Sequence, residues 1–367
     1  MNRLETYLIK LINAQGPITV ATFMAEALGN STHGYYMKKD PFGQDGDFTT
    51  APEISQMFGE MVGLWQAINW MNMGRPERIH LIELGPGRGT LMQDVLRSMK
   101  SIPGMLDAIV PHMVEMSPAL QKIQAENLKA YKTLTWHNRI SDVLTQAKGE
   151  PILVIANEFF DALPVRQFQK AESGWHERLV CTNNIDNHER LILQLAPMPS
   201  PEQIIPSALH RADEGSIAEI CTIGQNICAE IAEHIQQYSG AALFIDYGHI
   251  VHGTGDTLQA VKKHKYVDIL LEPGDVDLTT HVDFQSLKET ALQYGTQVYG
   301  PTDQGKFLKS LGIEARAQTL QANSSASQKE AVICALHRLT DNKEMGSLFK
   351  VMALSDTGLA NIVGFEE

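Results

Sequence analysis

Three glycines at alternate positions follow an acidic residue in the segment Leu81–Thr90, which reads LIELGPGRGT. Glycine lets a tight turn bring the backbone close to a ligand, and the helix N-terminus expected after the turn favours electron-rich groups. The spacing GxGxG differs from the GxGxxG of dinucleotide-binding proteins, which disfavours a dinucleotide without excluding one. We therefore expect Glu83, Gly85, Gly87 and Gly89 to form a ligand-binding turn.

Two further acids, Glu115 and Asp142, follow the next two predicted strands. A carboxylate at the first of these positions can accept hydrogen bonds from both hydroxyls of a ribose, and Asp142 is placed to meet an adenine amino group. Alternatively, Glu115 is a solvated strand end and Asp142 caps a helix that begins at Val143. With the glycine turn, these acids predict an adenosine-containing ligand. Glu83 would repel a pyrophosphate and attract an ammonium group, which favours a sulfonium cofactor over NAD.

A polar cluster of Asn157, Glu158 and Asp161 directly follows the apolar run Ile152–Ala156. Open parallel sheets bind ligands outside the carboxyl ends of their strands, where this segment should lie. We expect Glu158 and Asp161 to be catalytic and Asn157 to contact the cofactor through its amide. Alternatively, Asn157 and Asp161 cap a turn before Pro164, and Glu158 is a surface charge.

Residues 31–52 have no hydrophobic period and are rich in Gly, Asp, Thr and aromatic side chains. Such a long irregular segment in a compact domain is usually functional or disordered, and the aromatic residues argue against disorder. We expect Asp47, Phe48 and Glu53 to form a lid over the cofactor, although Glu53 could instead simply begin the next helix. His281 is a weaker candidate for the same cleft.

The elements that must position these residues alternate between short apolar runs and helical patterns. Strands are predicted at Ile79–Leu84, Ala108–Val114, Leu134–His137, Ile152–Ala156 and Ala242–Asp246, with later ones at Gln297–Tyr299 and Phe349–Ala353. Amphipathic spacing predicts helices at Glu53–Asn72, Thr90–Met99 and Ala119–Lys129. This alternation implies an α/β fold with a parallel sheet covered on both faces.

Residues 163–240 interrupt this alternation with antiparallel strand patterns, followed by a helix predicted over Ile217–Tyr238. We therefore divide the chain into three parts. Residues 1–75 form an N-terminal helical segment and cofactor lid, residues 76–162 and 241–367 form the sheet domain, and residues 163–240 form an inserted substrate lobe.

The formal net charge of −13 argues against a nucleic-acid partner, since such proteins normally carry a basic face. The four cysteines include no CxxC pair, so neither a disulfide framework nor a metal site is expected. The first residues resemble neither a signal peptide nor a transit segment, and no apolar stretch approaches the ~20 residues of a membrane span. We therefore expect a cytoplasmic protein without membrane insertion. The sequence does not indicate an oligomeric state.

The motifs together resemble the MidA-like methyltransferases, a family related to the mitochondrial complex I assembly protein-arginine methyltransferase. The matching segments are Gly34–Tyr36, Asp40–Gly43, Gly46–Phe48, Ala51–Ser55, Glu83–Gly89, Val114–Pro118, Asn157–Pro164, Phe244–Gly248 and Asp277–Phe284.

The resemblance implies a Rossmann-like, seven-stranded class I methyltransferase sheet with an N-terminal helical segment and an inserted α+β lobe. It implies S-adenosyl-L-methionine as the donor and adds Met116 to the cofactor contacts. A protein arginine on a complex I-type subunit or another protein is the implied acceptor, and Glu158 and Asp161 would offset the repulsion between its guanidinium and the sulfonium. Without a mitochondrial presequence, the chain looks like a bacterial member. The alternatives are a small-molecule methyltransferase, a cofactor-binding assembly factor with little catalysis, and a nicotinamide oxidoreductase.

Overall fold

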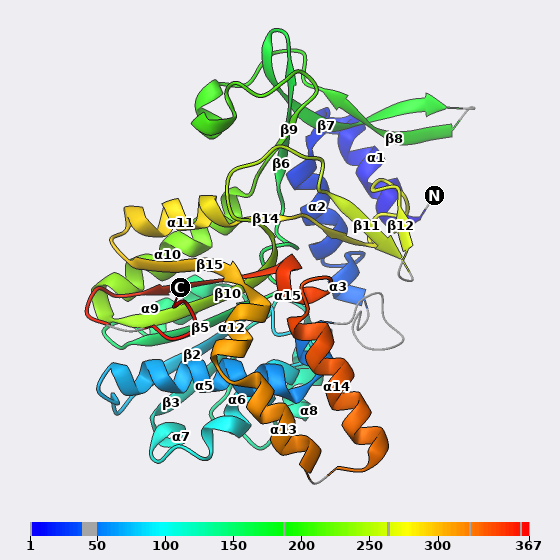
Figure 1. The fold of residues 1–367 in the computed structure, drawn as a ribbon. Helices are drawn as coiled ribbons and strands as arrows, with labels where there is room; N and C mark the ends of the chain where they lie inside the picture. The colour runs from blue at the N-terminus through cyan, green and yellow to red at the C-terminus, as the bar shows by residue number, and fades with distance from the viewer. Residues whose placement is uncertain are drawn as a thin grey trace.

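The computed structural model describes residues 2–38, 50–185, 188–262, 265–322, 324–359 and 362–366. Asp47 and Phe48, which we expect in the lid, lie outside these ranges. Among the described residues, seven strands of a central sheet follow one another in the order β15-β16-β10-β5-β2-β3-β4 (Figure 1). Their bounds are β2 Ile79–Leu84, β3 Ile109–Val114, β4 Thr135–His137, β5 Ile152–Asn157, β10 Gly240–His249, β15 Gln297–Asp303 and β16 Phe349–Ser355.

Strands β4, β3, β2, β5 and β10 are parallel, and β16 runs antiparallel to both of its neighbours. A short strand, β14 (Val282–Asp283), pairs in parallel with the end of β10. Every residue of β2 and β5 is buried, which explains why these strands read as continuous apolar runs. Because the strands are parallel, their carboxyl ends meet at one edge of the sheet.

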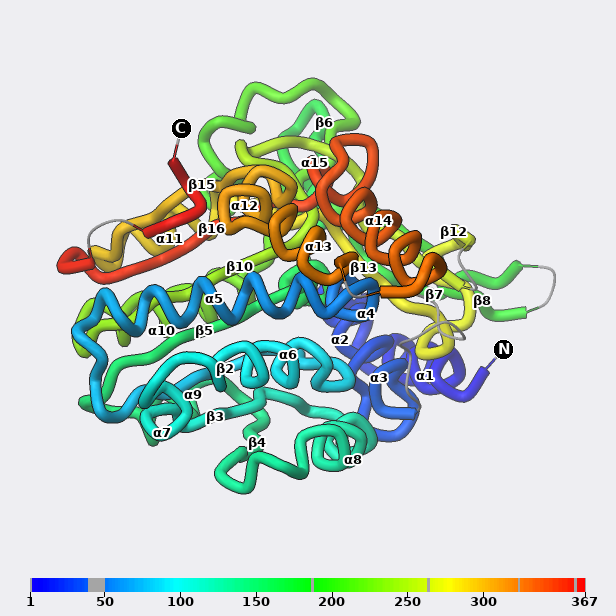
Figure 2. The backbone as a smooth tube through the Cα atoms, turned by 60° about the horizontal axis from the view of Figure 1, so that its bottom comes forward, coloured from blue at the N-terminus to red at the C-terminus, as the bar shows by residue number. Residues whose placement is uncertain are grey.

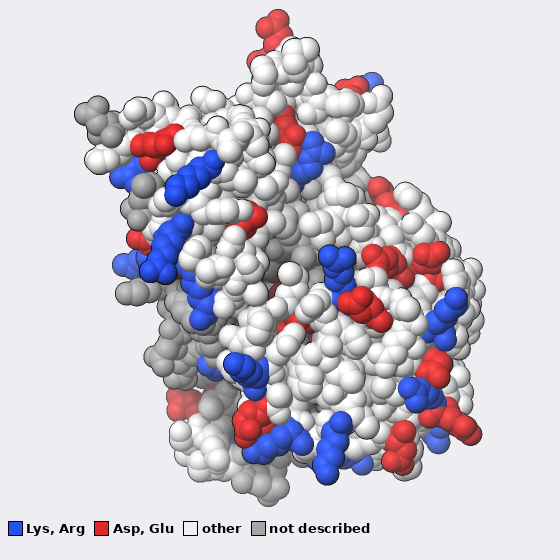
Figure 3. All heavy atoms as spheres, turned by 180° about the vertical axis from the view of Figure 1, so that it is seen from behind, with Lys and Arg blue, Asp and Glu red and all other residues white. Residues whose placement is uncertain are grey.

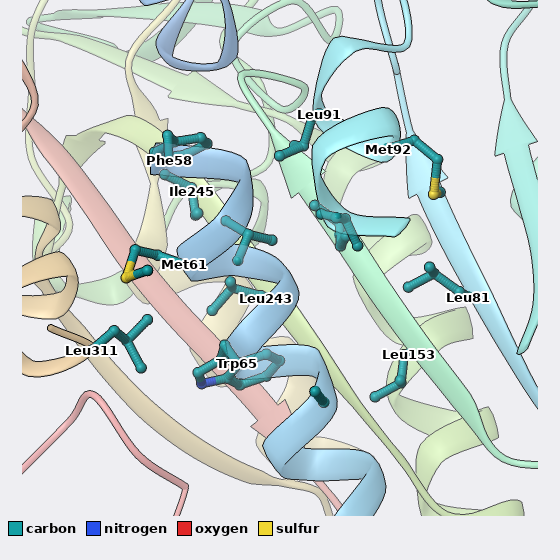
Figure 4. Close-up of a cluster of buried hydrophobic side chains, with 14 of the residues drawn as sticks. Phe58, Met61, Trp65, Leu81, Leu91, Met92, Leu153, Leu243, Ile245 and Leu311 are labelled. Atoms are coloured by element: carbon teal, nitrogen blue, oxygen red, sulfur yellow. The ribbon is translucent and has the colours of Figure 1, made fainter. Parts of the chain in front are cut away.

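Helices cover both faces of the sheet, and alternate strand residues pack against each layer. On one face, Leu81, Leu153 and Leu243 pack with Trp65 of α5, as Figure 4 shows. On the other face, Val154 and Phe244 pack with side chains of α9, α10 and α11. The helices of the sheet domain are α5 Gln56–Asn72, α6 Thr90–Met99, α7 Met105–Ala108, α8 Pro118–Asn127, α9 Ile140–Gln146, α10 Thr222–Tyr238, α11 Phe284–Gln293, α12 Gln304–Ser310, α13 Ile313–Ala322, α14 Ala326–Thr340 and α15 Met345–Leu348.

A second sheet contains β1 (Ile18–Thr19) from the N-terminal segment beside strands of the predicted lobe, in the order β1-β7-β6-β9, with β8 paired to β7. The lobe strands are β6 Arg166–Ala171, β7 Gly174–Ile185, β8 His188–Leu195 and β9 Ile217–Ile220. Helices α1 (Arg3–Gln15) and α2 (Val20–Gly29) pack on this sheet, and α3 (Tyr35–Lys38) lies next to α2 (Figures 1 and 2). A smaller sheet has the order β12-β11-β13, from Lys265–Val267, Gln259–Lys262 and Asp277–Thr279.

Two predicted elements are wrong. Residues Ile217–Ile220 form β9 rather than a helical turn, because Ala218 and Ile220 pack with Phe168 of the paired strand β6. The helix predicted over Glu53–Asn72 is divided at Ser55, whose extended backbone (φ −164°) ends α4 (Ala51–Ile54) and caps α5. The three-part division of the chain remains a proposal, although α10 packs on the central sheet, which favours ending the lobe before it.

Candidate active site

The glycine turn joins β2 to α6 at the carboxyl edge of the sheet. Gly85, Gly87 and Gly89 all have left-handed backbone, with φ of 59°, 53° and 80°. A Cβ on Gly85 would lie 2.9 Å from the Phe159 ring, so the turn has no room for a side chain there. The backbone N–H of Gly85 donates to the carbonyl of Val114, at 3.1 Å. The turn is thereby held beside the end of β3, and glycine is required by both conformation and space.

A pocket lies over this turn, with about 400 Å³ of space that is partly open to solvent. Its lining comes from the glycine turn and from two segments remote in sequence, and comprises Thr50, Pro52, Glu53, Glu83, Gly85, Pro86, Gly87, Arg88, Thr90, Leu91, Asn157 and Glu158. The structure therefore brings together the expected residues Glu83, Asn157, Glu158 and Glu53 with two of the three glycines. Gly89 follows directly as the N-cap residue of α6.

Two buried acceptors in this pocket, Glu83 Oε2 and Asn157 Oδ1, have no hydrogen-bond partner among the described residues. Burial, and next the nearby Glu115, raise the pKa of Glu83 well above its usual range. A buried acceptor without a partner is costly, and a bound ammonium group would satisfy both oxygens and favour the ionised carboxylate. These residues thus fit a cofactor with an amino-acid end.

The residues expected at the ribose and adenine lie beyond the lining of this pocket. Glu115 is nearly buried and accepts from the backbone N–H of Ser117 at 2.7 Å and from the amide of Gln124 at 3.2 Å. Gln124 also donates to the carbonyl of Gly87 at 2.7 Å, which links Glu115 to the glycine turn. Met116 is 61% exposed beside it. The contacts of Glu115 and Met116 with a cofactor remain predictions.

Asp142 is exposed in the first turn of α9, which begins at Ile140. The alternative that it caps a helix starting at Val143 is therefore wrong, because the helix starts two residues before Asp142. Its carboxylate instead lies where an acid is favoured by the helix dipole. A contact with adenine remains a prediction.

Asn157 ends β5, and Glu158 begins a turn with a left-handed backbone, φ 49°, which is unusual for a residue with a side chain. Glu158 Oε1 accepts from the backbone N–H of Ala51 at 2.9 Å and from the Asn157 amide at 3.2 Å. Burial raises the pKa of Glu158 to about 7, and Asp161 adds to the shift. Glu158 is therefore a half-buried group held at the pocket wall, not a surface charge.

Asp161 lies at the far end of the same turn and is 6% exposed. The Tyr247 hydroxyl donates to its carboxyl group, while burial raises the pKa of Asp161 to about 6. The backbone carbonyl of Asp161 accepts from the N–H of Thr280 at 2.9 Å. Asp161 is thus close to Glu158 but is not among the residues described as lining the cofactor pocket.

His281 lies behind Tyr247, with its ring edge-on at 5.5 Å between centroids. It lines a second pocket, with Phe160 and Asp283, on another side of the turn. Burial, and next the nearby His249, lower the pKa of His281, which favours the neutral ring. The structure therefore does not bring His281 into the pocket that Glu83 and Glu158 line.

Glu53 lies in α4 and does reach the pocket. Its Oε1 accepts from the hydroxyl of Thr90 at 2.6 Å, at the first residue of α6. The N-cap of α6 is Gly89, which offers no side chain, so Glu53 places a carboxylate at that helix N-terminus from another part of the chain. This contact fits a lid that closes on the glycine turn, a role that remains a proposal.

Sequence reasoning gave no role to Asp246 or Tyr36, and both hold parts of the site. The buried Asp246 accepts backbone N–H groups from the Glu158–Asp161 turn. The carbonyl of Tyr36 accepts from the Ser117 hydroxyl at 2.7 Å, which fastens the N-terminal segment beside Glu115. The sequence signal for Asp246 was its position: it is an acid at the end of the apolar run of β10, just as Glu83 is an acid near the end of β2.

The fold and the site together define the class of protein. The strand order with antiparallel β16, the glycine turn after β2 and the carboxylates at the ends of neighbouring strands are those of a class I methyltransferase. Residues 61–302 match the family of S-adenosyl-L-methionine-dependent methyltransferases. The chain belongs to that family, and S-adenosyl-L-methionine is its cofactor.

Named relatives and a solved structure agree with this assignment. The chain is 38% identical over 371 residues to protein arginine methyltransferase NDUFAF7, mitochondrial, of Danio rerio, covering 96% of this chain and 86% of the relative. Identity to the Homo sapiens protein of the same name is 37% over 370 residues, covering 95% and 82%. A crystal structure from Burkholderia thailandensis with bound S-adenosyl-homocysteine has a TM-score of 0.83 and 26% identity, covering 98% and 93%.

These comparisons correct one expectation. A bacterial cytoplasmic protein was expected from the N-terminal residues, and that is wrong, because the curated relatives are mitochondrial proteins of eukaryotes. No helix in the described part of the chain is long and apolar enough to cross a membrane. In the same residues, no group of three or more His, Cys, Asp or Glu side chains is arranged to hold a metal ion.

Proposed function

We propose that this methyltransferase acts on a guanidinium nitrogen of a protein arginine, and that Glu158 and Asp161 receive the acceptor. The observation that carries the proposal is a cluster of three carboxyl groups beside the cofactor pocket, in which Asp161 and Asp246 are buried and Glu158 is half-buried at the pocket wall. Burial raises the pKa of all three, Asp161 adds to the shift of Glu158, and Asp161 and Glu158 add to the shift of Asp246. A guanidinium cation beside Glu158 and Asp161 would relieve that repulsion and pair with their planar carboxylates.

The residues of this chain bind the cofactor, orient the acceptor and accept a proton. S-adenosyl-L-methionine supplies a methyl group activated by its sulfonium. Glu83 and Asn157 would hold the amino end of the cofactor through the two unpartnered oxygens. The acceptor nitrogen must lose one proton for each methyl group that it gains, and Glu158, with a pKa raised to about 7, is suited to take it. Asp161 and Tyr247 would orient the other side of the guanidinium.

A protein acceptor is supported by the relatives, which are named protein arginine methyltransferases. Figure 3 shows a hollow between the upper lobe and the lower body of the molecule, and Lys and Arg are interspersed with Asp and Glu on this face. We propose that, within residues 163–240, the part that contains β6 to β9 forms the lobe that meets the substrate protein, since α10 packs on the central sheet. A small-molecule acceptor and a cofactor-binding assembly role remain the alternatives.

The test is to incubate the protein with labelled S-adenosyl-L-methionine and a lysate of cells that lack it, and to locate labelled residues by mass spectrometry. We expect label on arginine side chains. Label on another residue type, or on small molecules only, would reject the arginine proposal, and an absence of transfer would favour the assembly role.

The variant Glu158→Gln tests the role of this carboxyl group. We expect transfer to fall by about 100-fold or more, because loss of a general base typically costs 10²–10⁴-fold, while S-adenosyl-homocysteine affinity stays within a few-fold. Glu60→Gln is the matched control, since Glu60 of α5 is buried but pairs with Arg97 of α6 and Arg316 of α13. Retained transfer by Glu158→Gln would remove Glu158 from the mechanism.

A further inference from the structure

The carboxyl group of Asp246 is fully buried beneath the active-site turn, with no exposed surface. Its Oδ2 accepts from three consecutive backbone N–H groups, at 3.2 Å from Phe159, 3.0 Å from Phe160 and 3.2 Å from Asp161. Its Oδ1 accepts from the N–H of Tyr247 at 2.9 Å. All four contacts are from donors, so both oxygens act as acceptors, as an ionised carboxylate does.

These N–H groups follow the strained residue of the turn. Glu158 has a left-handed backbone, which is unfavourable for a residue with a Cβ. Such a conformation persists only where its surroundings hold it. Glu158 lies one residue beyond the end of β5, and its N–H donates to the carbonyl of Ile245 at 2.9 Å. Two successive residues of β10 therefore hold the turn. Ile245 accepts from the N–H of the strained residue Glu158, and Asp246 accepts from the three N–H groups that follow it.

The direction of the Glu158 side chain depends on this turn. Its carboxyl group reaches the pocket wall and accepts from the N–H of Ala51, in a segment more than a hundred residues away in sequence. If the N–H groups of residues 159–161 lost their acceptor, the turn would relax and carry Glu158 with it. Asp246 itself is not among the residues that line the pocket.

We infer that Asp246 is a positioning residue for methyl transfer, which holds the Glu158–Asp161 turn so that Glu158 faces the acceptor beside the cofactor. It acts through the turn and touches neither cofactor nor acceptor. This inference rests on the proposed role of Glu158.

Asp246 also affects the ionisation of the carboxyl groups of Glu158 and Asp161. Asp161 and Glu158 face it from the turn, and Tyr247 lies next to it on β10. Burial and the two neighbouring carboxyl groups raise the pKa of Asp246, while the N–H donors favour its ionised form. Repulsion between carboxylates is mutual, so removing the charge of Asp246 should make Glu158 and Asp161 easier to ionise.

The experiment compares Asp246→Asn with Asp356→Asn. Asp356 is the matched control, because its carboxylate accepts from the N–H of Gly240 at the opposite end of the same strand. For Asp246→Asn we expect the rate of labelled methyl transfer into the lysate to fall by about 100-fold, the cost of a small misplacement in a catalytic site. Its affinity for S-adenosyl-homocysteine, measured by calorimetry, should stay within about threefold, since Glu83 and Asn157, which would hold the cofactor, belong to β2 and β5 and not to the turn. Asp356→Asn should transfer at nearly the wild-type rate.

Two readouts separate positioning from general destabilisation. The pH midpoint of the residual transfer rate should move to lower pH in Asp246→Asn, and the amide hydrogens of residues 159–161 should exchange faster while those of β5 stay protected. Transfer within threefold of wild type would overturn the inference. So would a loss of cofactor affinity as large as the loss of rate, because the pocket as a whole would then have collapsed.

A second variant serves if Asp246→Asn does not fold. Asp246→Glu keeps the charge and displaces the carboxylate by one methylene, so we expect a reduced rate with an unchanged pH midpoint. A normal rate in Asp246→Glu would overturn the inference. Failure of the wild-type protein to label arginine would instead reject the proposed function, and the amide exchange of residues 159–161 would still report whether Asp246 holds the turn.

Discussion

A chain of three histidines crosses the sheet beneath the cofactor site, and it predicts how the protein responds to acid. His80 and His112 lie 2.8 Å apart between ring nitrogens, and His112 and His137 lie 3.2 Å apart. The first two rings are fully buried. They belong to β2 and β3, the strands that lead to Glu83 and Glu115. Protonation of these histidines would place positive charge inside the part of the sheet that supports the cofactor site.

The magnitude follows from the middle ring. Burial, and next the neighbouring His80, His137 and Arg78, lower the pKa of His112 from 6.5 to about 3. The unfolded chain therefore takes up this proton before the folded protein does, so the stabilisation is complete above pH 6.5 and is lost as the pH falls towards 3. Each pH unit in that window removes about 1.4 kcal/mol, which gives a loss of about 2 kcal/mol at pH 5.

The assay must isolate this ring from other titrating groups. Burial also lowers the pKa of His80 and His137, whereas the raised pKa of Glu83 works in the opposite direction over the same range. We therefore compare wild type with His112→Asn by urea unfolding at pH 7.5 and pH 5. The difference in unfolding free energy between the two proteins should shrink by about 2 kcal/mol at the lower pH.

The control is His337→Asn, a substitution of an exposed histidine on α14. The difference in unfolding free energy between this variant and wild type should change little between the two pH values. If the difference between wild type and His112→Asn is the same at pH 7.5 and pH 5, the buried neutral histidine chain does not contribute to acid sensitivity and the reasoning is refuted.

Three further predictions concern the cofactor pocket. Gly87→Val forces a β-branched residue into a left-handed backbone with φ 53°, so S-adenosyl-homocysteine binding should fall below detection by calorimetry; near-normal affinity would show that the turn does not approach the cofactor. Glu83→Gln removes the charge of an unpartnered acceptor, and the affinity for S-adenosyl-homocysteine should fall about 10- to 100-fold, as expected for a charged hydrogen bond. The control variant Glu60→Gln should keep the wild-type affinity. Equal affinity in Glu83→Gln and wild type would place the amino end of the cofactor elsewhere. Glu53→Ala removes the carboxylate at the N-terminus of α6 and should lower the free energy of unfolding by about 1 kcal/mol. It should also weaken S-adenosyl-homocysteine binding several-fold, whereas a stability loss with unchanged affinity would leave Glu53 as a helix start only.

Local patterns predicted the part of the fold that surrounds the cofactor. The strands β2 and β5 were expected to within a residue, because strands covered on both faces are apolar at every position. The glycine turn was identifiable because its backbone conformation excludes other residues. The strand β9 was missed, since Ile217–Ile220 continues smoothly into the amphipathic pattern of α10, and only pairing with β6 selects the extended form.

Composition and spacing by themselves determined the glycine turn, the parallel sheet and the carboxylates at its edge, because each of these follows from the preferences of neighbouring residues. Tertiary structure alone decided what those carboxylates do. The N–H of Ala51 donates to Glu158, the hydroxyl of Thr90 donates to Glu53, and Asp246 holds the turn between β5 and β6, in each case across long stretches of sequence. A carboxylate's pKa and direction depend on burial and on donors brought from elsewhere in the chain, and these are properties of the folded packing that no local pattern contains.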